Sequence, residues 1–265
     1  MKGLDDTVAA VANDILAAYA SRAPIAPVRT RLPADSVEVA YRVQQAAVVH
    51  WQKAGRRIVG RKIGLTAKAV QKQLGVDQPD YGVLFADMCL GDNEEVAAGA
   101  VLQPKVEAEV ALILANDIGA ADATVADVIR ATAYALPAIE IVGSRIANWD
   151  IRIVDTIADN ASSGLFALGG PARRLDGLDL SNCEMVLTKN GQKASAGKGA
   201  ACLGNPLNAA AWLARRMAAL GTPLRAGDVI MTGALGPMVP AAPGETFEAN
   251  IGGLGSVRVS FAASS

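Results

Sequence analysis

Short runs of apolar and β-branched residues fill the chain from residue 106 onward, and they limit the possible fold more than any other feature. VEAEVALIL (106–114) and PAIEIV (137–142) are typical of strands, and they flank a helical pattern at residues 124–135. Three later runs are further strand candidates: DVIMTG (228–233), ETFEANI (245–251) and GSVRVSF (255–261). Strands mixed with helices in this way predict an α+β fold whose sheet is mostly antiparallel or mixed.

Helical spacing dominates the first fifth of the chain. Apolar residues recur at this spacing in residues 5–20 and again in residues 36–53. Asp35 precedes the second segment, and Glu38 lies three residues further on, which predicts a capping box. A third, short helix is expected at residues 66–75, between a threonine that can cap it and a glycine that can end it.

Two later segments have clear local signals. Asn190 and Gly191 lie between two alternating runs, and this dipeptide suits the positive φ angles of a type I′ hairpin turn. Asn205 followed by Pro206 is typical of a helix start, and Gly221 is typical of its end. We therefore expect a hairpin followed by a helix in this part of the chain.

Length and composition fit one globular domain. The chain has 265 residues, so we expect a single catalytic domain over residues 1–265, with a mainly helical region (1–58) packed on a β-rich core (59–265). The 25 Lys and Arg balance the 26 Asp and Glu, which argues against nucleic acid or an acidic membrane as a partner. The three cysteines form no CxxC pair, and neither a signal peptide nor a membrane-spanning run is evident, so we expect a cytoplasmic protein.

The acidic residues inside two predicted strands are the first candidates for chemistry. Glu107 and Glu109 are two residues apart, so both side chains leave the same face of the strand. Glu140 lies among apolar residues, where an unpaired charge is costly. Three convergent carboxylates would suit Mg²⁺ or Mn²⁺. Spacing alone favours a plainer alternative, in which the first two line a solvated face and Glu140 pairs with Arg145.

Six segments with distinctive motifs span nearly the whole chain: GRKIGLT (60–66), GVDQPDYGVLFADM (75–88), EAEVAL (107–112), PAIEIVGSRI (137–146), DTIADNASSG (155–164) and TGALGPM (232–238). Taken together in order and spacing, they resemble the 2-keto-4-pentenoate hydratase group of the fumarylacetoacetate hydrolase superfamily. The resemblance implies a mixed β-sheet roll or barrel with flanking helices and a helical N-terminal region. It also implies that Glu107, Glu109 and Glu140 bind a divalent metal, Mg²⁺ or Mn²⁺.

The resemblance further implies that Lys62 and Asp80 are catalytic acid/base groups and that, of the two serines in DNASSG, Ser162 orients water or holds the substrate carboxylate. Each of these residues also has a simpler interpretation. Lys62 follows several arginines and could be a solvated surface lysine, Asp80 follows a proline as turn residues do, and the serine lies in what could be an ordinary loop.

Three residues are implied to contact the substrate: Ser163, Thr232 and Gly233. The threonine and glycine end a strand, where a backbone amide and a hydroxyl can approach an anion. A simple glycine turn that ends the strand is the alternative. Asn205 stands where we expect a histidine in close relatives, which leaves details of the pocket open.

The activity implied by the resemblance is the addition of water to 2-hydroxypenta-2,4-dienoate, giving 4-hydroxy-2-oxopentanoate in the meta-cleavage catabolism of aromatic compounds. A 4-oxalocrotonate decarboxylase, which needs the same carboxylates, and a non-catalytic companion subunit are the alternatives. The resemblance also implies a homo-oligomer that could associate with other enzymes of the pathway.

The single histidine argues against two other classes of enzyme. His50 shares a predicted helix face with Val43 and Ala47, so we expect a partly buried packing residue. Relatives that hydrolyse carbon–carbon bonds use a histidine as general base, and this histidine does not match their motif. One histidine also cannot form a histidine-rich zinc or iron site.

Overall fold

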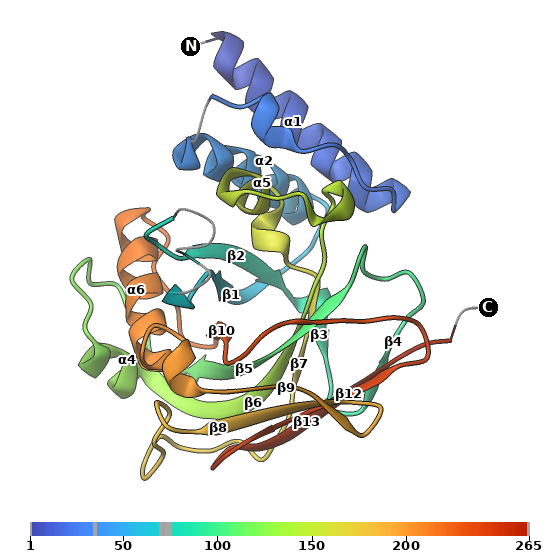
Figure 1. The fold of residues 1–265 in the computed structure, drawn as a ribbon. Coiled ribbons are helices and arrows are strands. Elements are labelled where there is room, and N and C mark those ends of the chain that lie inside the picture. The colour runs from blue at the N-terminus through green and yellow to red at the C-terminus, as the bar shows by residue number, and fades with distance from the viewer. Residues whose placement is uncertain (1, 34–35, 69–70, 72–75, 264–265) are drawn as a thin grey trace.

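The computed structural model describes residues 2–33, 36–68, 71 and 76–263. Two sheets lie below a layer of helices, with one more pair of helices against the side (Figure 1). The described α-helices are α1 (Lys2–Ser21), α2 (Val37–Lys53), α4 (Val125–Ala131), α5 (Ile153–Ala158) and α6 (Pro206–Ala219). No described helix combines the length and apolar character needed to cross a bilayer.

The larger sheet is mixed, and five of the six motifs of the resemblance lie at least partly in its strands, whereas DTIADNASSG (155–164) lies in α5 and η4 (Asn160–Ser162). Its strands, in spatial order, are β2 (Asp80–Phe85), β1 (Ile58–Gly64), β10 (Val229–Ala234), β5 (Lys105–Leu114), β6 (Thr132–Val142), β7 (Leu165–Leu168) and β3 (Cys89–Leu90), with β11 (Val239–Pro240) also paired to β5. β1 is parallel to β10 and β3 to β7, while the remaining pairs are antiparallel.

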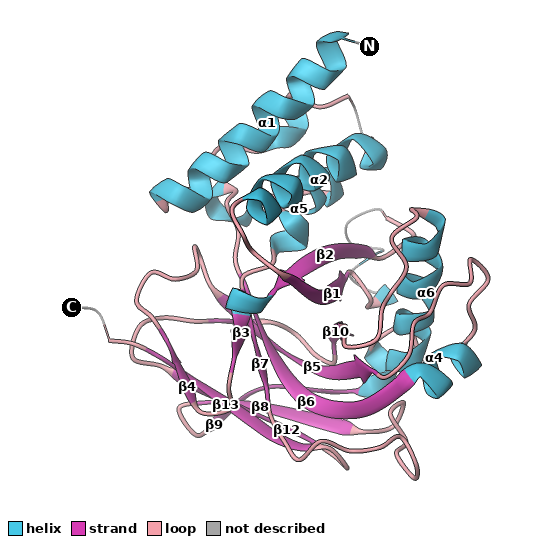
Figure 2. Cartoon of the chain, turned by 180° about the vertical axis from the view of Figure 1, so that it is seen from behind, coloured by secondary structure: helices cyan, strands magenta, loops and turns pink. Residues whose placement is uncertain are grey.

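The smaller sheet packs beneath the larger one (Figure 2). It consists, in spatial order, of β4 (Glu94–Val96), β13 (Gly255–Phe261), β12 (Thr246–Ile251), β8 (Glu184–Lys189) and β9 (Gln192–Lys198). The predicted hairpin turn connects β8 to β9, and Asn190 and Gly191 adopt φ angles of 53° and 76°. The expected type of turn is therefore confirmed, as are the strands β10, β12 and β13.

Alternation along β5 separates the apolar core from the face that carries the acidic residues. Val106, Ala108 and Val110 are buried in the cluster that also contains Leu187 of β8 and Phe247 of β12. The side chains between them on β5 must leave the opposite face. The smaller sheet therefore covers one face of the larger sheet, and the other face is free to form a site.

The N-terminal helices cover part of that other face. Trp51 of α2 packs with Phe85 of β2, and their rings meet edge to face with centroids 5.6 Å apart. A separate apolar cluster joins α1, α2 and α5, with Val11, Ile15 and Val43 fully buried in it. These contacts bring α5 and the turn after it over the open face of the larger sheet (Figure 1).

The helix predicted at residues 124–135 is shorter in the structure. α4 begins after Thr124, whose side chain accepts a hydrogen bond from the Asp127 amide, and β6 starts at Thr132. Tyr134 and the residues after it pair with β5, opposite Ile113 and its neighbours. Cross-strand pairing of a buried sheet therefore overrides the helical pattern at the end of this segment.

Two predicted helix starts need comment. α2 is capped by Ser36, whose hydroxyl accepts a hydrogen bond from the Val39 amide at 3.4 Å. The cap therefore lies one residue later than predicted, and Asp35 is outside the described residues. The short helix expected at residues 66–75 falls largely on residues 69–70 and 72–75, which are also outside the described residues.

The prediction that His50 is partly buried is wrong. Its side chain is exposed, while Val43 and Ala47 of the same helix are buried. His50 lies in the last turn of α2 and borders the large cavity between α1, α2 and the loop at residues 97–102, which leaves it exposed although it shares the helix face of Val43. The helix start at Asn205 is confirmed, because its side chain accepts a hydrogen bond from the Leu207 amide.

Candidate metal centre and active site

Three carboxylates meet on the open face of the larger sheet. Glu107 of β5 lies directly opposite Glu140 of β6 in the antiparallel register, and Glu109 follows two residues further along β5. One carboxylate oxygen from each residue lies within 4.8 Å of the others. Because the strands fix all three side chains on one face, this geometry follows from the backbone.

The three carboxylates have too little positive charge around them. Both oxygens of Glu140 are buried, and neither has a hydrogen-bond partner among the described residues. Lys62 Nζ lies 3.3 Å from Glu140 Oε1, within ion-pair distance but not aligned as a hydrogen bond, and one ammonium cannot neutralise three carboxylates. A divalent cation with oxygen ligands would satisfy these groups, so the residues present fit Mg²⁺ or Mn²⁺.

The pKa values of the three carboxyl groups reflect the same shortage of positive charge. Burial raises the pKa of Glu107 to about 7, and the charge of Glu140 adds to this effect. Burial also raises the pKa of Glu109, again with help from Glu140, and that of Glu140 itself. Each carboxylate therefore resists ionisation until a cation compensates the charge.

Lys62 reaches this cluster because the sheet curls. β1 is separated from β6 by β10 and β5, yet Lys62 Nζ approaches Glu140 and also donates a hydrogen bond to the Ala161 carbonyl at 2.9 Å. Burial alone would lower the pKa of Lys62, but Glu140 and Asp80 outweigh it and raise the pKa. Lys62 is a buried ammonium, so the alternative of a solvated surface lysine is wrong.

Asp80 borders the same space as Lys62. It is the first residue of β2, opposite Gly64 of β1, and it is buried. A Cβ on Gly64 would lie 2.2 Å from Asp80 Oδ1 and 3.6 Å from Lys62 Nζ, so only glycine leaves this space open. Within the part of the chain that the structure describes, Asp80 Oδ1 has no hydrogen-bond partner, and burial raises the pKa of this carboxyl despite the nearby ammonium. The alternative that Asp80 is a simple turn residue is therefore wrong.

A strained turn places the serine. Asn160, Ala161 and Ser162 form η4 (Asn160–Ser162) with φ angles of 52°, 52° and 55°, a conformation that non-glycine residues rarely adopt. Asn160 holds the turn to β2 through two hydrogen bonds with the backbone of Val83, at 2.8 and 2.9 Å. The turn directs the Ala161 carbonyl to Lys62 and brings the Ser162 hydroxyl 3.0 Å from Thr156 Oγ1.

The three residues expected to contact substrate have other partners in the structure. Ser163 Oγ donates to the Asn160 carbonyl at 2.6 Å, and Thr232 Oγ1 donates to the Val110 carbonyl at 2.8 Å. The Gly233 amide donates to Glu109 Oε2 at 2.8 Å. None of the three lines the cavity beside the carboxylates. Gly233 therefore orients a candidate metal ligand.

A cavity of about 90 Å³ connects these groups to solvent. Lys62, Asp80, Glu107 and Ser162 line its inner part. A larger cavity of about 480 Å³ lies elsewhere, between α1, α2 and the loop at residues 97–102, and contains none of the three clustered glutamates. We place the candidate active site in the smaller cavity because that is where the unsatisfied groups converge.

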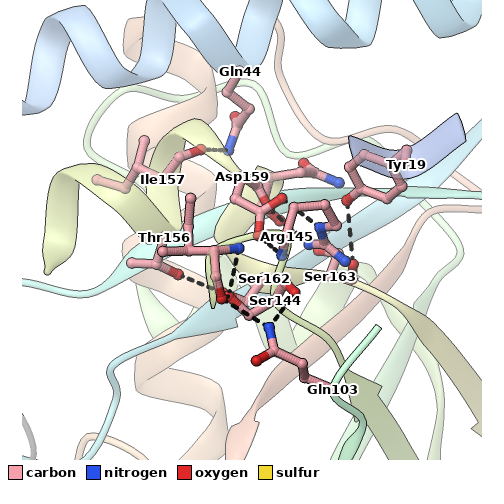
Figure 3. Close-up of polar contacts among 12 residues, drawn as sticks. Tyr19, Gln44, Gln103, Ser144, Arg145, Thr156, Ile157, Asp159, Ser162 and Ser163 are labelled. Carbon is pink, nitrogen blue, oxygen red and sulfur yellow. Dashed lines mark hydrogen bonds and ion pairs between the residues drawn. The ribbon is translucent and has the colours of Figure 1, made fainter. Parts of the chain in front are cut away.

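Sequence reasoning missed the polar network behind η4. Arg145 pairs with Asp159, through Nε to Oδ1 at 2.5 Å and through its backbone amide to Oδ2 at 2.9 Å (Figure 3). The plainer alternative, in which Arg145 pairs with Glu140, is therefore wrong. Thr156 was also missed, although it lies in the DTIADNASSG segment. Arg145 and Asp159 lie in different segments of the chain, so no local sequence pattern predicted that they would pair.

Comparison with known proteins places this arrangement in a family. Residues 40–262 match the family model described as fumarylacetoacetate (FAA) hydrolase C-terminal. The chain belongs to the fumarylacetoacetate hydrolase family, and its fold is the curled mixed sheet with flanking helices expected for that family.

Relatives that match nearly the whole chain show which members of the family it resembles. The chain is 58% identical over 253 residues to 2-keto-4-pentenoate hydratase 2 of Dechloromonas aromatica (strain RCB), covering 96% of this chain and 97% of the relative. It is 56% identical over 257 residues to 2-keto-4-pentenoate hydratase of Burkholderia vietnamiensis (strain G4 / LMG 22486), covering 97% and 98%. Among solved structures, 4-oxalocrotonate decarboxylase from Pseudomonas putida G7, complexed with magnesium and adipate, has a TM-score of 0.93 at 35% identity, covering 97% of this chain and 98% of the other.

Proposed function

We propose that this protein is a divalent-metal-dependent hydratase that adds water to 2-hydroxypenta-2,4-dienoate, in the catabolism of aromatic compounds by meta-cleavage. The observation that carries the proposal is the buried cluster of Glu107, Glu109 and Glu140 beside Lys62 and Asp80. The similarity to hydratases over nearly the whole chain supports the choice of reaction.

In the proposed reaction, Glu107, Glu109 and Glu140 would hold Mg²⁺ or Mn²⁺ and leave its remaining positions to substrate and water. When bound, the ion supplies a positive charge that stabilises negative charge on the C2 oxygen of the substrate. The Gly233 amide keeps Glu109 Oε2 oriented, because it donates a hydrogen bond to that oxygen.

Lys62 and Asp80 are the proposed acid/base pair. The substrate loses the proton of its 2-hydroxyl and gains one at C5, which makes C4 electrophilic. No described residue forms a hydrogen bond with Asp80 Oδ1, so this oxygen can accept a proton, while the raised pKa of Lys62 keeps it a protonated donor beside the cluster. The two groups border one space, so a proton can pass between substrate atoms within it.

Ser162 and Thr156 are proposed to position the attacking water. Their hydroxyls are 3.0 Å apart and both line the cavity. The water adds its oxygen to C4 and C3 gains a proton, so the product, 4-hydroxy-2-oxopentanoate, differs from the substrate by one water. Two adjacent hydroxyls can hold a water through donor and acceptor contacts together. The structure gives Ser163 and Thr232 hydrogen bonds away from the cavity, so their proposed role is to support its wall.

We also propose that residues 1–265 act as one catalytic domain in a cytoplasmic homo-oligomer that could associate with other enzymes of its pathway. Packing of Trp51 on Phe85 supports the first point, because α2 shares an apolar cluster with the larger sheet. Light scattering of the purified protein would test for an oligomer, and a monomer at micromolar concentration would contradict it.

The first experiment mixes the enzyme with fresh 2-hydroxypenta-2,4-dienoate and Mg²⁺ or Mn²⁺. We expect the ultraviolet absorbance of the dienoate to fall, EDTA to prevent the fall, and the product mass to increase by one water. Glu107→Gln and Glu140→Gln should abolish turnover and leave the fold intact, since each removes an anionic ligand and keeps the shape. Normal activity of either variant without added metal would overturn the proposal.

A 4-oxalocrotonate decarboxylase is the second candidate, and the solved structure with a TM-score of 0.93 favours it. The same sample is therefore offered 2-oxohex-3-enedioate. Release of CO₂ without hydration of the dienoate would identify a decarboxylase. No reaction with either substrate would favour a non-catalytic companion subunit.

A further inference from the structure

The segment between β6 and α5 has an unusual backbone at the mouth of the active-site cavity. Asn148 and Trp149, in η3 (Ala147–Trp149), adopt φ angles of 59° and 54°. The left-handed region is uncommon for non-glycine residues, and for one as large as tryptophan it is a true outlier. Such a conformation persists only where surrounding contacts impose it, and it is concentrated at functional sites.

Gln103 imposes this conformation through four hydrogen bonds. Its side-chain nitrogen donates to the carbonyls of Ser144 and Ile146, both at 2.8 Å, as Figure 3 shows in part. Its side-chain oxygen accepts from the Asn148 amide at 2.8 Å, and its backbone carbonyl accepts from Trp149 Nε1 at 2.9 Å. One residue therefore fixes both the backbone of the segment and the direction of the indole.

The indole is also held from the other side. Lys105 Nζ lies 4.1 Å from the centroid of the ring, a cation–π contact. Lys105 precedes Glu107 by two residues on β5, so it leaves the same face of the strand as the carboxylate cluster. Trp149 is thus fixed at the outer end of the row of charged groups, and it lines the cavity that contains Lys62 and Asp80.

The cavity has buried polar groups at its inner end, and the rest of its lining is mainly apolar. Through the cation that they would hold, the carboxylates of β5 and β6 would place the C1 and C2 oxygens of a 2-oxo acid at this inner end, so the carbon chain would extend toward the mouth. The rest of the lining contains one charged side chain, Arg152, and five apolar side chains: Leu65, Val142, Trp149, Ile151 and Met238. The whole cavity measures about 90 Å³, so any group added to the carbon chain meets this wall.

We propose that Trp149 is a specificity-determining residue, whose indole closes the outer end of the cavity and limits the size of the C5 substituent on the substrate. Gln103 is the positioning residue that holds the indole there. The inference rests on the proposed hydratase function for the identity of the substrate. Its structural part, that the wall limits chain length, applies to any 2-oxo acid bound at the carboxylates.

The test measures kcat/KM of the wild type, Trp149→Ala and Trp149→Phe with 2-hydroxypenta-2,4-dienoate and with its 5-methyl and 5-propyl homologues. We expect the wild type to lose efficiency as the substituent grows. Trp149→Ala should raise the ratio of 5-propyl to unsubstituted substrate on the order of tenfold, the scale at which apolar pockets discriminate small groups. Trp149→Phe keeps most of the wall and should shift the ratio less, in the same direction.

A matched control and a binding measurement keep this test separate from the proposed function. Trp212→Phe alters a half-buried tryptophan of α6 that packs against the main core outside the cavity, and should leave the ratio unchanged. Calorimetric titration of the Mg²⁺-loaded proteins with 2-oxopentanoate and 2-oxooctanoate repeats the comparison without turnover. Circular dichroism verifies that each variant folds.

The outcomes are distinct. If the wild type converts no dienoate but Trp149→Ala still gains affinity for the longer 2-oxo acid, the proposed reaction fails and the inference on the wall stands. If the ratio of long to short ligand is the same in the wild type and both folded Trp149 variants, by kinetics and by calorimetry, the inference is overturned.

Discussion

Two groups of buried charges lie on either side of the η4 turn, and they differ in whether their hydrogen-bond partners are present. Arg145 and Asp159 are buried together, and both oxygens of Asp159 accept hydrogen bonds from Arg145. The guanidinium also lies 4.2 Å from the ring centroid of Tyr19. In the carboxylate cluster, by contrast, neither oxygen of Glu140 has a hydrogen-bond partner in the described parts of the chain, although Lys62 lies within ion-pair distance.

The difference separates a structural network from a binding site. A buried charge is tolerated when its partners come from the same chain, as for Arg145 and Asp159. Buried carboxylates whose partners are missing are tolerated when something else supplies the compensation. The comparison therefore predicts opposite responses: changes in the first group should affect stability, and changes in the second should affect metal binding and turnover.

The largest expected effect is on turnover in Glu140→Gln. The amide keeps the shape but loses the charge, so we expect turnover to fall at least about thousandfold, or about 4 kcal/mol. The free energy of unfolding without metal should change by less than about 1 kcal/mol, because one of several crowded negative charges is removed. Kinetics and urea denaturation measure the two quantities, and Glu184→Gln, on the exposed side of β8, is the control. A large loss of stability with normal turnover would break the comparison.

The second expected effect is on stability in Asp159→Ala. Removal of the carboxylate leaves the Arg145 guanidinium buried without its partner, which costs about 3–5 kcal/mol. Urea denaturation of the metal-free protein measures this loss. The double variant Arg145→Met with Asp159→Leu should lose less than the single variant, because no unpaired charge remains. Equal stability of Asp159→Ala and the wild type would show that this pair is not structural.

Sequence predicted the cluster better than the network, and the reason is geometric. Alternation along one strand fixes Glu107 and Glu109 on a common face, so their convergence follows from local spacing. Lys62 joins Glu140 only because the sheet curls across two intervening strands, which the resemblance implied and no local pattern could show.

The misses in the fold have the same origin. The helical pattern at residues 124–135 ends at β6 because residues from Thr132 onward pair with β5, a contact between segments that local periodicity does not contain. His50 repeats the apolar spacing of its helix but borders the large cavity and is therefore exposed. The hydrogen bond between Gln103 and Trp149 is likewise a tertiary contact, which local periodicity does not contain.

The third expected effect comes from the metal itself. Mg²⁺ at a hundred times its dissociation constant should stabilise the wild type by about 2.7 kcal/mol, because it binds the folded chain and not the unfolded one. Asp159→Ala should gain a similar amount, whereas Glu140→Gln should gain little. Thermal unfolding with EDTA or with Mg²⁺ measures the three differences. Stabilisation of Glu140→Gln equal to that of the wild type would place the ion elsewhere.

The smallest expected effect is in Tyr19→Phe, which tests how much of the network is essential. The variant loses only the hydroxyl that donates to the Ser163 carbonyl at 3.4 Å, and it keeps the ring against Arg145. A long neutral hydrogen bond contributes little, so the free energy of unfolding should fall by less than about 1 kcal/mol and turnover should not change. Tyr19→Leu also removes the ring and should lose more stability. A change in metal affinity in Tyr19→Phe would mean that the two buried groups are coupled through η4, and the separation argued above would then fail.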